Sequence, residues 1–469
     1  IQLVNTNSGT TSSNALEITL DSGGAEADII NRENGRIGLW TNNTERLRIA
    51  SDGSLSTPTL GTSNVRFGVN AGNSIASGGN YNVCVGDEAG TAITTGDNNV
   101  AVGYASLDAL TTGSTNTGLG SYSLSSNTTA GNNVGVGYFA LKANTTGAYN
   151  VAVGTNALDA NTTASNNSAM GANALGKNTT GTSNVAVGKG ALSESLTADN
   201  NTAVGYLALT TNTTGHTNTA IGAQAATAVT TGDNNIAIGY RSLYTEDTGN
   251  RSIAIGDYAL TVQNNDDSNY NIAIGYNSLG ATTTGMNNVA VGGLALDANT
   301  TASNNTALGY ASLTANTTGQ YNTAVGSSAL EANTTADNNT AMGVSALATN
   351  TTGANNTAIG RKAMQVNTTG TSNVAVGKEA MLTNTTGANN TAIGKDSLRL
   401  NTTGAGNTVL GHNALESNTT ASNNTAIGKD SLKANTTGDE NVAVGAASLD
   451  ANTTGVSNTA LGSGALGAN

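Results

Sequence analysis

The side chains that most often carry out chemistry are few in this sequence of 469 residues, and they are not grouped. The two histidines, His216 and His412, lie 196 residues apart, and the single cysteine, Cys84, cannot form an intrachain disulfide. A zinc site or a nucleophile–histidine–acid triad needs several such groups close together, and no such set is visible. We therefore predict that the chain is not an enzyme, with no catalytic residues, no metal site and no cofactor.

Carboxylates and glycines give no stronger signal for catalysis. Asp108, Asp159, Asp297 and Glu331 stand singly, and we expect solvated positions for them. No glycine-rich segment precedes the Lys-Ser or Lys-Thr pair of a phosphate-binding loop. The formal net charge of −13 provides no basic field for phosphate backbones, so we expect no nucleic-acid partner. No apolar run approaches the 18 residues that a membrane span requires.

A repeat of 17 residues accounts for most of the composition. Its unit is seen in Asn373 to Gly387, and its most regular part is Asn-x-Ala-x-Gly, whose last residue we call the marker glycine. Marker glycines run from Gly86 to Gly462, and 21 of the 22 intervals between them are 17 residues; the exception, Gly256 to Gly275, is 19. A fixed period of this length is typical of a solenoid, in which each repeat forms one coil. We therefore predict an all-β chain, a parallel β-roll or β-solenoid of 17-residue coils.

Positions in a coil are numbered from the marker glycine, and four of them indicate a short strand. Positions −3 and −1 are Val, Thr, Ile, Leu or Met, whereas position −2 is almost always Ala. Side chains alternate between the two faces of a strand. We expect the larger side chains to form the core of the coil. The small face, Ala and Gly, is then expected to make a close contact with a neighbouring wall or another chain.

Two further positions are predicted to stabilise the stack. Leu at position +4, as in Leu107 and Leu313, is expected to form a second row of the core. Asn occupies position −4 in 22 of the 23 coils, with Ser252 as the exception, and position +7 in 16 of them. An amide both donates and accepts hydrogen bonds, so stacked Asn side chains can bond to the coils above and below. Cys84, which stands where other coils have Ala, is expected to be a buried small residue.

Residues 1–63 do not follow the repeat, and we expect a separate, hairpin-rich β module there. Residues 37–41 and 45–49 alternate in polarity around Asn42-Asn43, which predicts an antiparallel hairpin. Residues 1–4 and 16–20 are two further strand candidates, and Pro58 marks the junction with the repeats. A solenoid shaft of about 24 coils is expected over residues 64–469. Two extra residues near Asn264–Asp267 are expected to form an outward, solvated loop.

Two resemblances to known families suggest a function. Thr44 to Gly53 resembles a segment of bacteriophage tail-fibre proteins that joins fibre-shaft repeats, and this resemblance implies a trimer. The recurring Asn-x-Ala-x-Gly of residues 64–469 resembles the head repeats of trimeric autotransporter adhesins, which implies a left-handed parallel β-roll in a trimer. The period of 17 residues departs from the shorter coil of those heads. The chain begins at Ile1 without Met and ends inside a repeat at Asn469, so we expect further sequence at both ends.

These observations favour a structural shaft of a phage tail fibre, located in the virion tail, that holds or contributes to host attachment. The alternative is a trimeric adhesin on a bacterial surface, and a third hypothesis is an ice-binding solenoid. The expected partners are two further copies of the chain, tail or surface proteins at both ends, and a host glycan or protein. Six tyrosines near marker glycines are candidate glycan contacts or ordinary packing residues: Tyr104, Tyr138, Tyr206, Tyr240, Tyr276 and Tyr310.

Overall fold

The secondary structure is β throughout the part of the chain that the computed structural model describes, which is residues 16–20, 27–31, 36–51, 55–57, 60–266 and 268–467. No helix occurs among these residues. The chain divides into two units, Ile1–Ser183 and Asn184–Asn469. The fold class predicted from the 17-residue period is confirmed, because both units contain parallel coils with one strand each.

Antiparallel strands precede the coils in the first unit. Strand β1 (Leu16–Leu20) pairs with β2 (Ala27–Asn31), and β3 (Ile37–Thr41) pairs with β4 (Thr44–Ile49), which also pairs with β5 (Leu55–Ser56). Asn42 and Asn43 turn the β3–β4 hairpin, both with positive φ, a conformation that Asn tolerates better than most residues. The predicted hairpin and the strand at residues 16–20 are confirmed. The predicted strand at residues 1–4 and the junction at Pro58 lie outside the described residues.

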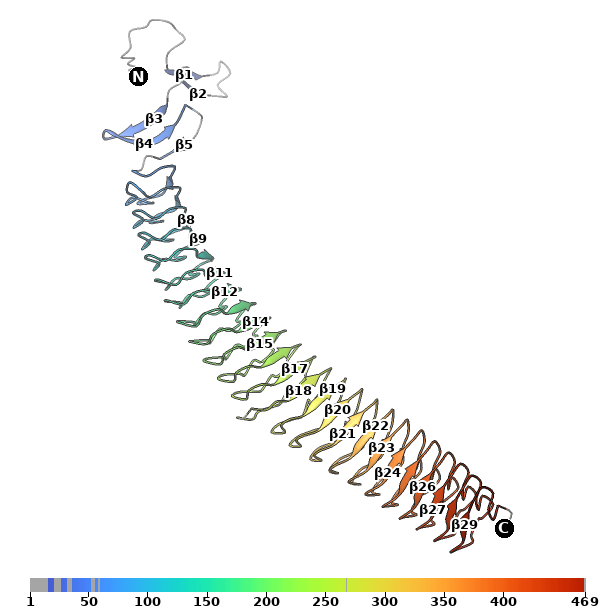
Figure 1. Ribbon diagram of the computed structural model, residues 1–469. Helices are drawn as coiled ribbons and strands as arrows, with labels where there is room; N and C mark the ends of the chain where they lie inside the picture. The colour runs from blue at the N-terminus through green and yellow to red at the C-terminus, as the bar shows by residue number, and fades with distance from the viewer. Residues whose placement is uncertain are drawn as a thin grey trace. The chain divides into compact units, whose positions relative to one another are not determined.

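The coils of the first unit contain one three-residue strand each (Figure 1). These strands pair in parallel, with equivalent residues side by side; for example, Ala152 of one coil pairs with Ala169 of the next. They are β6 (Val65–Phe67), β7 (Val83–Val85), β8 (Val100–Val102), β9 (Thr117–Leu119), β10 (Val134–Val136), β11 (Val151–Val153) and β12 (Ser168–Met170).

The second unit repeats this arrangement over a longer series, again with parallel pairing in register, as between Ala375 and Ala392. Its strands are β13 (Val185–Val187), β14 (Thr202–Val204), β15 (Thr219–Ile221), β16 (Ile236–Ile238), β17 (Ile253–Ile255), β18 (Ile272–Ile274), β19 (Val289–Val291), β20 (Thr306–Leu308), β21 (Thr323–Val325), β22 (Thr340–Met342), β23 (Thr357–Ile359), β24 (Val374–Val376), β25 (Thr391–Ile393), β26 (Thr408–Leu410), β27 (Thr425–Ile427), β28 (Val442–Val444) and β29 (Thr459–Leu461).

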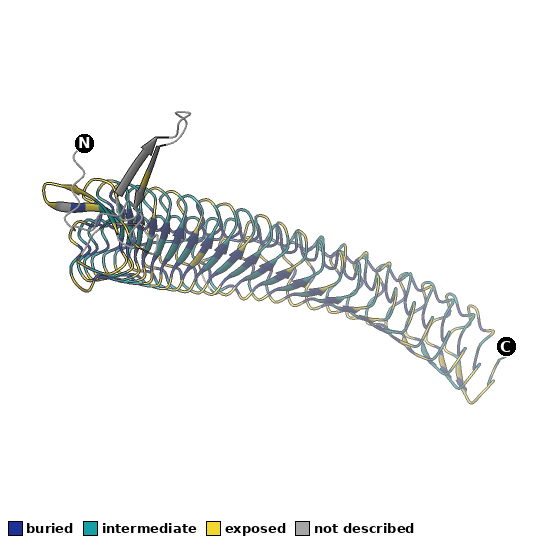
Figure 2. Cartoon of the chain, turned by 90° about the horizontal axis from the view of Figure 1, so that it is seen from above, coloured by how far each residue is buried: buried dark blue, intermediate teal, exposed yellow. Residues whose placement is uncertain are grey.

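The two faces of the strand are the reverse of the prediction. Ala at position −2 is fully buried in coil after coil, as Ala307 shows, whereas Leu308 at position −1 is 47% exposed. Where Gly135 takes position −2, a β-carbon would lie 3.3 Å from the Cγ atom of Leu124 at position +4 of the preceding coil. Leucine therefore lies in the interior on the same side of the strand as position −2, where the residue is Ala in most coils and Val409 is also fully buried. Figure 2 shows buried and more exposed residues alternating around each coil.

The marker glycine makes its close contact with the next coil of the same chain. Gly292 has a φ of +137°, and a β-carbon on it would lie 2.6 Å from the carbonyl carbon of Gly309. This backbone conformation is nearly restricted to glycine. The prediction that the Ala and Gly face supplies contacts between chains is therefore wrong: the alanine is core, and the glycine allows successive coils to stack.

Position +4, the predicted second row of the core, lies in the core and supplies most of the largest buried side chains. Leu313 and its equivalents are buried except Leu466 of the last coil, which is 45% exposed, and Met364 and Met381, which replace Leu, are fully buried. These residues adopt the left-handed conformation, with a φ of 51° at Leu313. That conformation costs roughly 1–2 kcal/mol per residue for an L-amino acid, and burial of a leucine side chain, at roughly 1.5–3 kcal/mol, offsets it.

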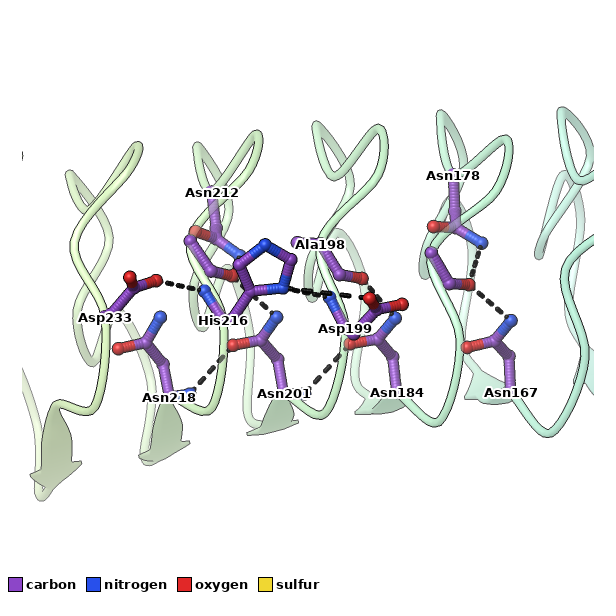
Figure 3. Close-up of polar contacts among 12 residues, drawn as sticks. Asn167, Asn178, Asn184, Ala198, Asp199, Asn201, Asn212, His216, Asn218 and Asp233 are labelled. Atoms are coloured by element: carbon purple, nitrogen blue, oxygen red, sulfur yellow. Dashed lines mark hydrogen bonds and ion pairs between the residues drawn. The ribbon is translucent and has the colours of Figure 1, made fainter.

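Both predicted rows of asparagine form ladders, and they lie inside the coils. At position −4, the Oδ1 atom of Asn184 accepts a hydrogen bond of 2.9 Å from the backbone N–H of Asn201, and its Nδ2 donates to the carbonyl of Ala198 at 2.7 Å (Figure 3). At position +7, Nδ2 of Asn384 donates to Oδ1 of Asn367 at 2.7 Å. The side chains therefore satisfy buried backbone groups at two corners of the coil.

The second ladder is interrupted next to the 19-residue interval. Glu246 replaces Asn at position +7 and is fully buried. Its carboxylate accepts hydrogen bonds from Gln263 Nε2 at 2.6 Å, Asn269 Nδ2 at 3.1 Å and the backbone N–H of Gly249 at 2.8 Å. Burial raises the pKa of Glu246 above its ordinary value, although these hydrogen bonds oppose the shift. In the inserted loop, Asn264 and Asp266 are exposed, as predicted, and Asp267 lies outside the described residues.

Candidate functional site

The residues directly after the marker glycines line one edge of the coils in each unit. We call this row, position +1, the post-glycine edge. Its backbone is fixed by hydrogen bonds between coils: the N–H at position +2 donates to the carbonyl at position +1 of the preceding coil, as from Tyr122 to Tyr104 at 2.9 Å. One side chain is therefore displayed per coil, at the strand spacing of about 4.8 Å.

All six tyrosines predicted as candidate glycan contacts lie on this edge. Two belong to the first unit and four to the second, and their exposed fractions range from 37% at Tyr240 to 61% at Tyr310. The structure therefore places them in one row in each unit. It also gives most of them a packing role, because their rings contact other aromatic rings or the neighbouring coil.

In the first unit, Tyr104 and Tyr138 belong to an aromatic cluster that the sequence analysis only partly identified. The ring of Tyr122, at position +2, lies edge-on to Tyr104 with 5.2 Å between centroids. Phe139 stacks on Tyr138 at 3.8 Å and is tilted against Tyr122 at 5.4 Å. The missed signal is a spacing of 18 residues, which brings an aromatic residue at position +1 beside one at position +2 of the next coil. Lys142 places its ammonium 4.0 Å from the ring centroid of Phe139.

The second unit contains a similar cluster. Tyr258 lies edge-on to Tyr240 at 5.4 Å and to Tyr276 at 6.2 Å. The guanidinium of Arg241 lies 5.2 Å from the ring centroid of Tyr240. Edge-to-face contacts of this kind add stability beyond the apolar area that they bury. Tyr240 and Tyr276 remain 37% and 60% exposed, so packing leaves part of each side chain accessible to solvent.

The four carboxylates predicted to be solvated share position +5 of their coils. Glu331 is exposed, as predicted. Asp108, Asp159 and Asp297 are only partly exposed, so the prediction is wrong for these three. In each of them burial raises the pKa of the side chain, because removal from water disfavours the charged form.

His216 has acidic neighbours in register, which the sequence analysis missed. Asp199 and Asp233 occupy the same position, +11, in the coils on either side (Figure 3). The Nδ1 atom of His216 accepts a hydrogen bond of 3.0 Å from the backbone N–H of Asp199, and Asp233 accepts one of 2.6 Å from the backbone N–H of His216. Nδ1 therefore carries no proton in this arrangement, so its distance of 3.9 Å from the Asp199 carboxylate is not an ion pair.

The polar side chains in this row therefore serve the backbone: like His216 and Asp233, Ser165 and Asp337 accept an N–H from the preceding coil. Across the described residues, no group of three His, Cys, Asp or Glu side chains could hold a metal ion. Cys84 is fully buried in β7, in the position of Ala, as predicted. Burial raises the pKa of its thiol to about 11, so it stays protonated and unreactive at neutral pH.

Comparison of the chain with protein-family models, with curated proteins and with solved structures finds no match. In the part of the chain that the structure describes, no helix is long and apolar enough to span a membrane.

Proposed function

We propose that this chain is a structural shaft of a bacteriophage tail fibre, assembled from three copies and located in the virion tail. The observation that carries the proposal is the outward face of the strands. Position −1 presents a row of partly exposed aliphatic side chains in each unit: Leu119 and Met170 in the first, and Ile221, Ile274, Leu308, Met342, Ile359, Ile393 and Leu410 in the second. A row of this kind is a typical protein-binding surface.

The size of this face suits self-association. In the second unit, 17 strands of three residues at the usual strand spacings give a surface of about 80 Å by 10 Å, on the order of 800 Å², which is one side of a standard protein interface. Identical copies would present identical rows in register. A closed threefold arrangement is a simple way to cover such a face and produce an unbranched fibre.

Two alternatives use the same fold. A bacterial surface adhesin would need the same trimer, and the resemblance of residues 44–53 to tail-fibre segments favours the virion. An ice-binding solenoid would need outward rows of threonine hydroxyls. The first Thr of a pair donates its hydroxyl to a carbonyl of the next coil, as Thr385 does to Thr402 at 2.9 Å. Because that hydroxyl is already engaged, this arrangement weighs against an ice-binding role.

The location of the protein, on phage particles or on the bacterial surface, distinguishes the tail-fibre role from the adhesin role. Antibodies raised against the purified chain, visualised with gold by electron microscopy, are expected to label fibres on phage particles released by lysis. Labelling of the bacterial outer surface in cultures without phage particles would reject the proposal in favour of an adhesin. Partners at the two ends of the fibre and the receptor on the host would then be sought in the labelled particles.

A further inference from the structure

Basic residues replace the tyrosines on the post-glycine edge towards the end of the second unit. Five successive coils place a basic residue type at position +1: Arg361, Lys378, Lys395, His412 and Lys429. Residues 341–438 contain seven Lys and Arg against four Asp and Glu, a net charge of +3, whereas the remainder of the chain has ten against 26, a net charge of −16. The positive charge is therefore concentrated in this segment, and four of its seven Lys and Arg residues lie on the post-glycine edge.

Backbone hydrogen bonds fix the spacing of this row. The carbonyls of Arg361, Lys378 and Lys395 accept N–H groups from position +2 of the following coils at 3.1, 3.0 and 3.1 Å. The four Lys and Arg side chains are well exposed, from 47% at Lys378 to 68% at Lys429. Cationic groups thus project from a rigid backbone at intervals of about 4.8 Å.

Carboxylates beside the row hold the basic side chains without covering them. Lys378 lies 3.5 Å from Glu379, and Lys395 lies 3.2 Å from Asp396. The acidic side chains are recessed, at 17% and 14% exposure, whereas the ammonium-bearing side chains are about half exposed. An ammonium group has three donors, so each lysine keeps N–H groups that face the solvent. The acids orient the row and leave an excess of positive charge.

We propose that this basic row binds a linear anionic polysaccharide along the edge of the coils. A row on an open edge suits an extended polymer better than a small molecule, because equivalent donors recur with each coil. Acidic sugars supply carboxylate, phosphate or sulfate groups, all of which accept charge-assisted hydrogen bonds from Lys and Arg. The tyrosine rings earlier on the same edge of this unit suit the sugar rings themselves.

Nucleic acid fits the charges less well. Duplex DNA carries one charge per about 1.7 Å of its axis, which is far denser than one basic side chain per coil. The acidic remainder of the chain would also repel a long, densely charged polymer. The inference goes beyond the proposed shaft role, and its test needs no virion. A negative binding result would not contradict the shaft role, and rejection of the shaft role would not contradict binding of the polysaccharide.

The test measures binding of the full-length protein to immobilised polygalacturonate, dextran sulfate and neutral dextran at low and moderate salt. Binding to at least one of the two acidic polymers, weakened by salt and absent for neutral dextran, is expected. The variant with Lys378→Gln, Lys395→Gln and Lys429→Gln is expected to bind about tenfold more weakly, since three exposed charge contacts are lost. A control variant with Arg46→Gln, Lys177→Gln and Arg251→Gln loses the same charge at exposed positions outside the post-glycine edge and should change binding less than about twofold.

Matching thermal melting curves for the three proteins establish that the substitutions leave the coils folded. Equal weakening by both variants would show a general charge effect and overturn the assignment to this row. Unchanged binding by the first variant would also overturn the assignment to this row. So would a failure of the unmodified protein to bind either acidic polymer. Stronger binding to a single-stranded DNA oligonucleotide, lost in the first variant, would replace the polysaccharide with a nucleic acid.

Discussion

At the residue scale, the marker glycine is the position at which the solenoid tolerates no side chain. Gly292→Ala would place a β-carbon against Gly309 of the next coil in a backbone conformation that suits glycine. We expect a local loss of about 3 kcal/mol, seen as faster amide hydrogen exchange in β19 and β20. Gly293→Ala is the matched control, because its β-carbon would meet nothing closer than 3.7 Å. Equal exchange rates in the two variants would contradict this role.

The asparagine at position −4 offers a second matched pair. Asn356 is buried and donates from Nδ2 to the carbonyl of Gly370 at 2.8 Å, whereas Asn355 is exposed. Asn356→Asp puts a carboxylate oxygen against that carbonyl, so we expect a loss of at least about 2 kcal/mol at neutral pH. Asn355→Asp should change stability by less than about 0.5 kcal/mol, because it is a surface substitution. Hydrogen exchange of the surrounding coils would measure both, and similar losses would argue against the ladder.

Backbone conformation is the part of the residue-level structure that the sequence predicted least. Asn at position +12, as in Asn389 with a φ of 60°, is a residue type that often adopts the left-handed conformation. Leu313 and Leu347 adopt it as well, although leucine has no such preference. Their conformation follows from the narrow turn beneath the strand, which the amino-acid types alone do not reveal. Burial of Leu313 could nevertheless be predicted from its period.

At the element scale, the orientation of the strand is the main correction. Alternation of Ala with larger residues predicted two distinct faces, but not which of them lies inside. The side chains at position −2 and the Leu side chains at position +4 share the interior, as the full burial of Ala307 and Leu313 shows. Edge clusters were missed for a similar reason, since Tyr104 meets Tyr122 only when two coils are stacked.

Two leucines of one coil test this orientation. Leu313→Ala removes a fully buried side chain, and we expect a local loss of about 2–5 kcal/mol. Leu308→Ala removes a side chain that is 47% exposed on the single chain, so a monomeric form should lose less than about 1 kcal/mol. Exchange rates of amides in β20 and β21 would compare them. If Leu308→Ala destabilised a monomer more than Leu313→Ala, the face of the strand with the larger side chains would have to lie in the core.

The buried Glu246 is expected to make the local stability at the interrupted asparagine ladder depend on pH. Its pKa is raised in the folded chain, so folding retains a proton that the unfolded chain loses at lower pH. Stability should therefore fall as the pH rises from the ordinary glutamate pKa through the raised one, and the reduced level should persist above it. Glu246→Gln removes the titrating group and should flatten this local profile. Hydrogen exchange near Gln263 across acidic to neutral pH would reveal it, and a variant with the same profile as the unmodified chain would exclude Glu246 as the cause.

At the scale of the whole molecule, one repeated coil forms the β-solenoid of each unit, and we propose that copies of the chain assemble through its outward aliphatic face. The 17-residue period predicted the solenoid, the leucine core and both asparagine ladders. The period also placed the six tyrosines after marker glycines, but it did not reveal their aromatic partners, such as Tyr122 beside Tyr104, which meet only in the stacked coils. The tail-fibre shaft and the trimer are proposals supported by the exposed aliphatic row and by the resemblance of residues 44–53.

The mass of the purified chain in solution, measured by light scattering coupled to size-exclusion chromatography, tests whether three copies assemble. We predict three times the 46.3 kDa of one chain. A variant with Leu308→Lys, Ile359→Lys and Ile393→Lys is predicted to fall to the mass of one chain. The control, with Thr318→Lys, Thr352→Lys and Thr386→Lys at exposed positions, should remain trimeric. A mass of 46.3 kDa for the unmodified chain, or a trimer that survives the first set of substitutions, would contradict assembly through the outward aliphatic face.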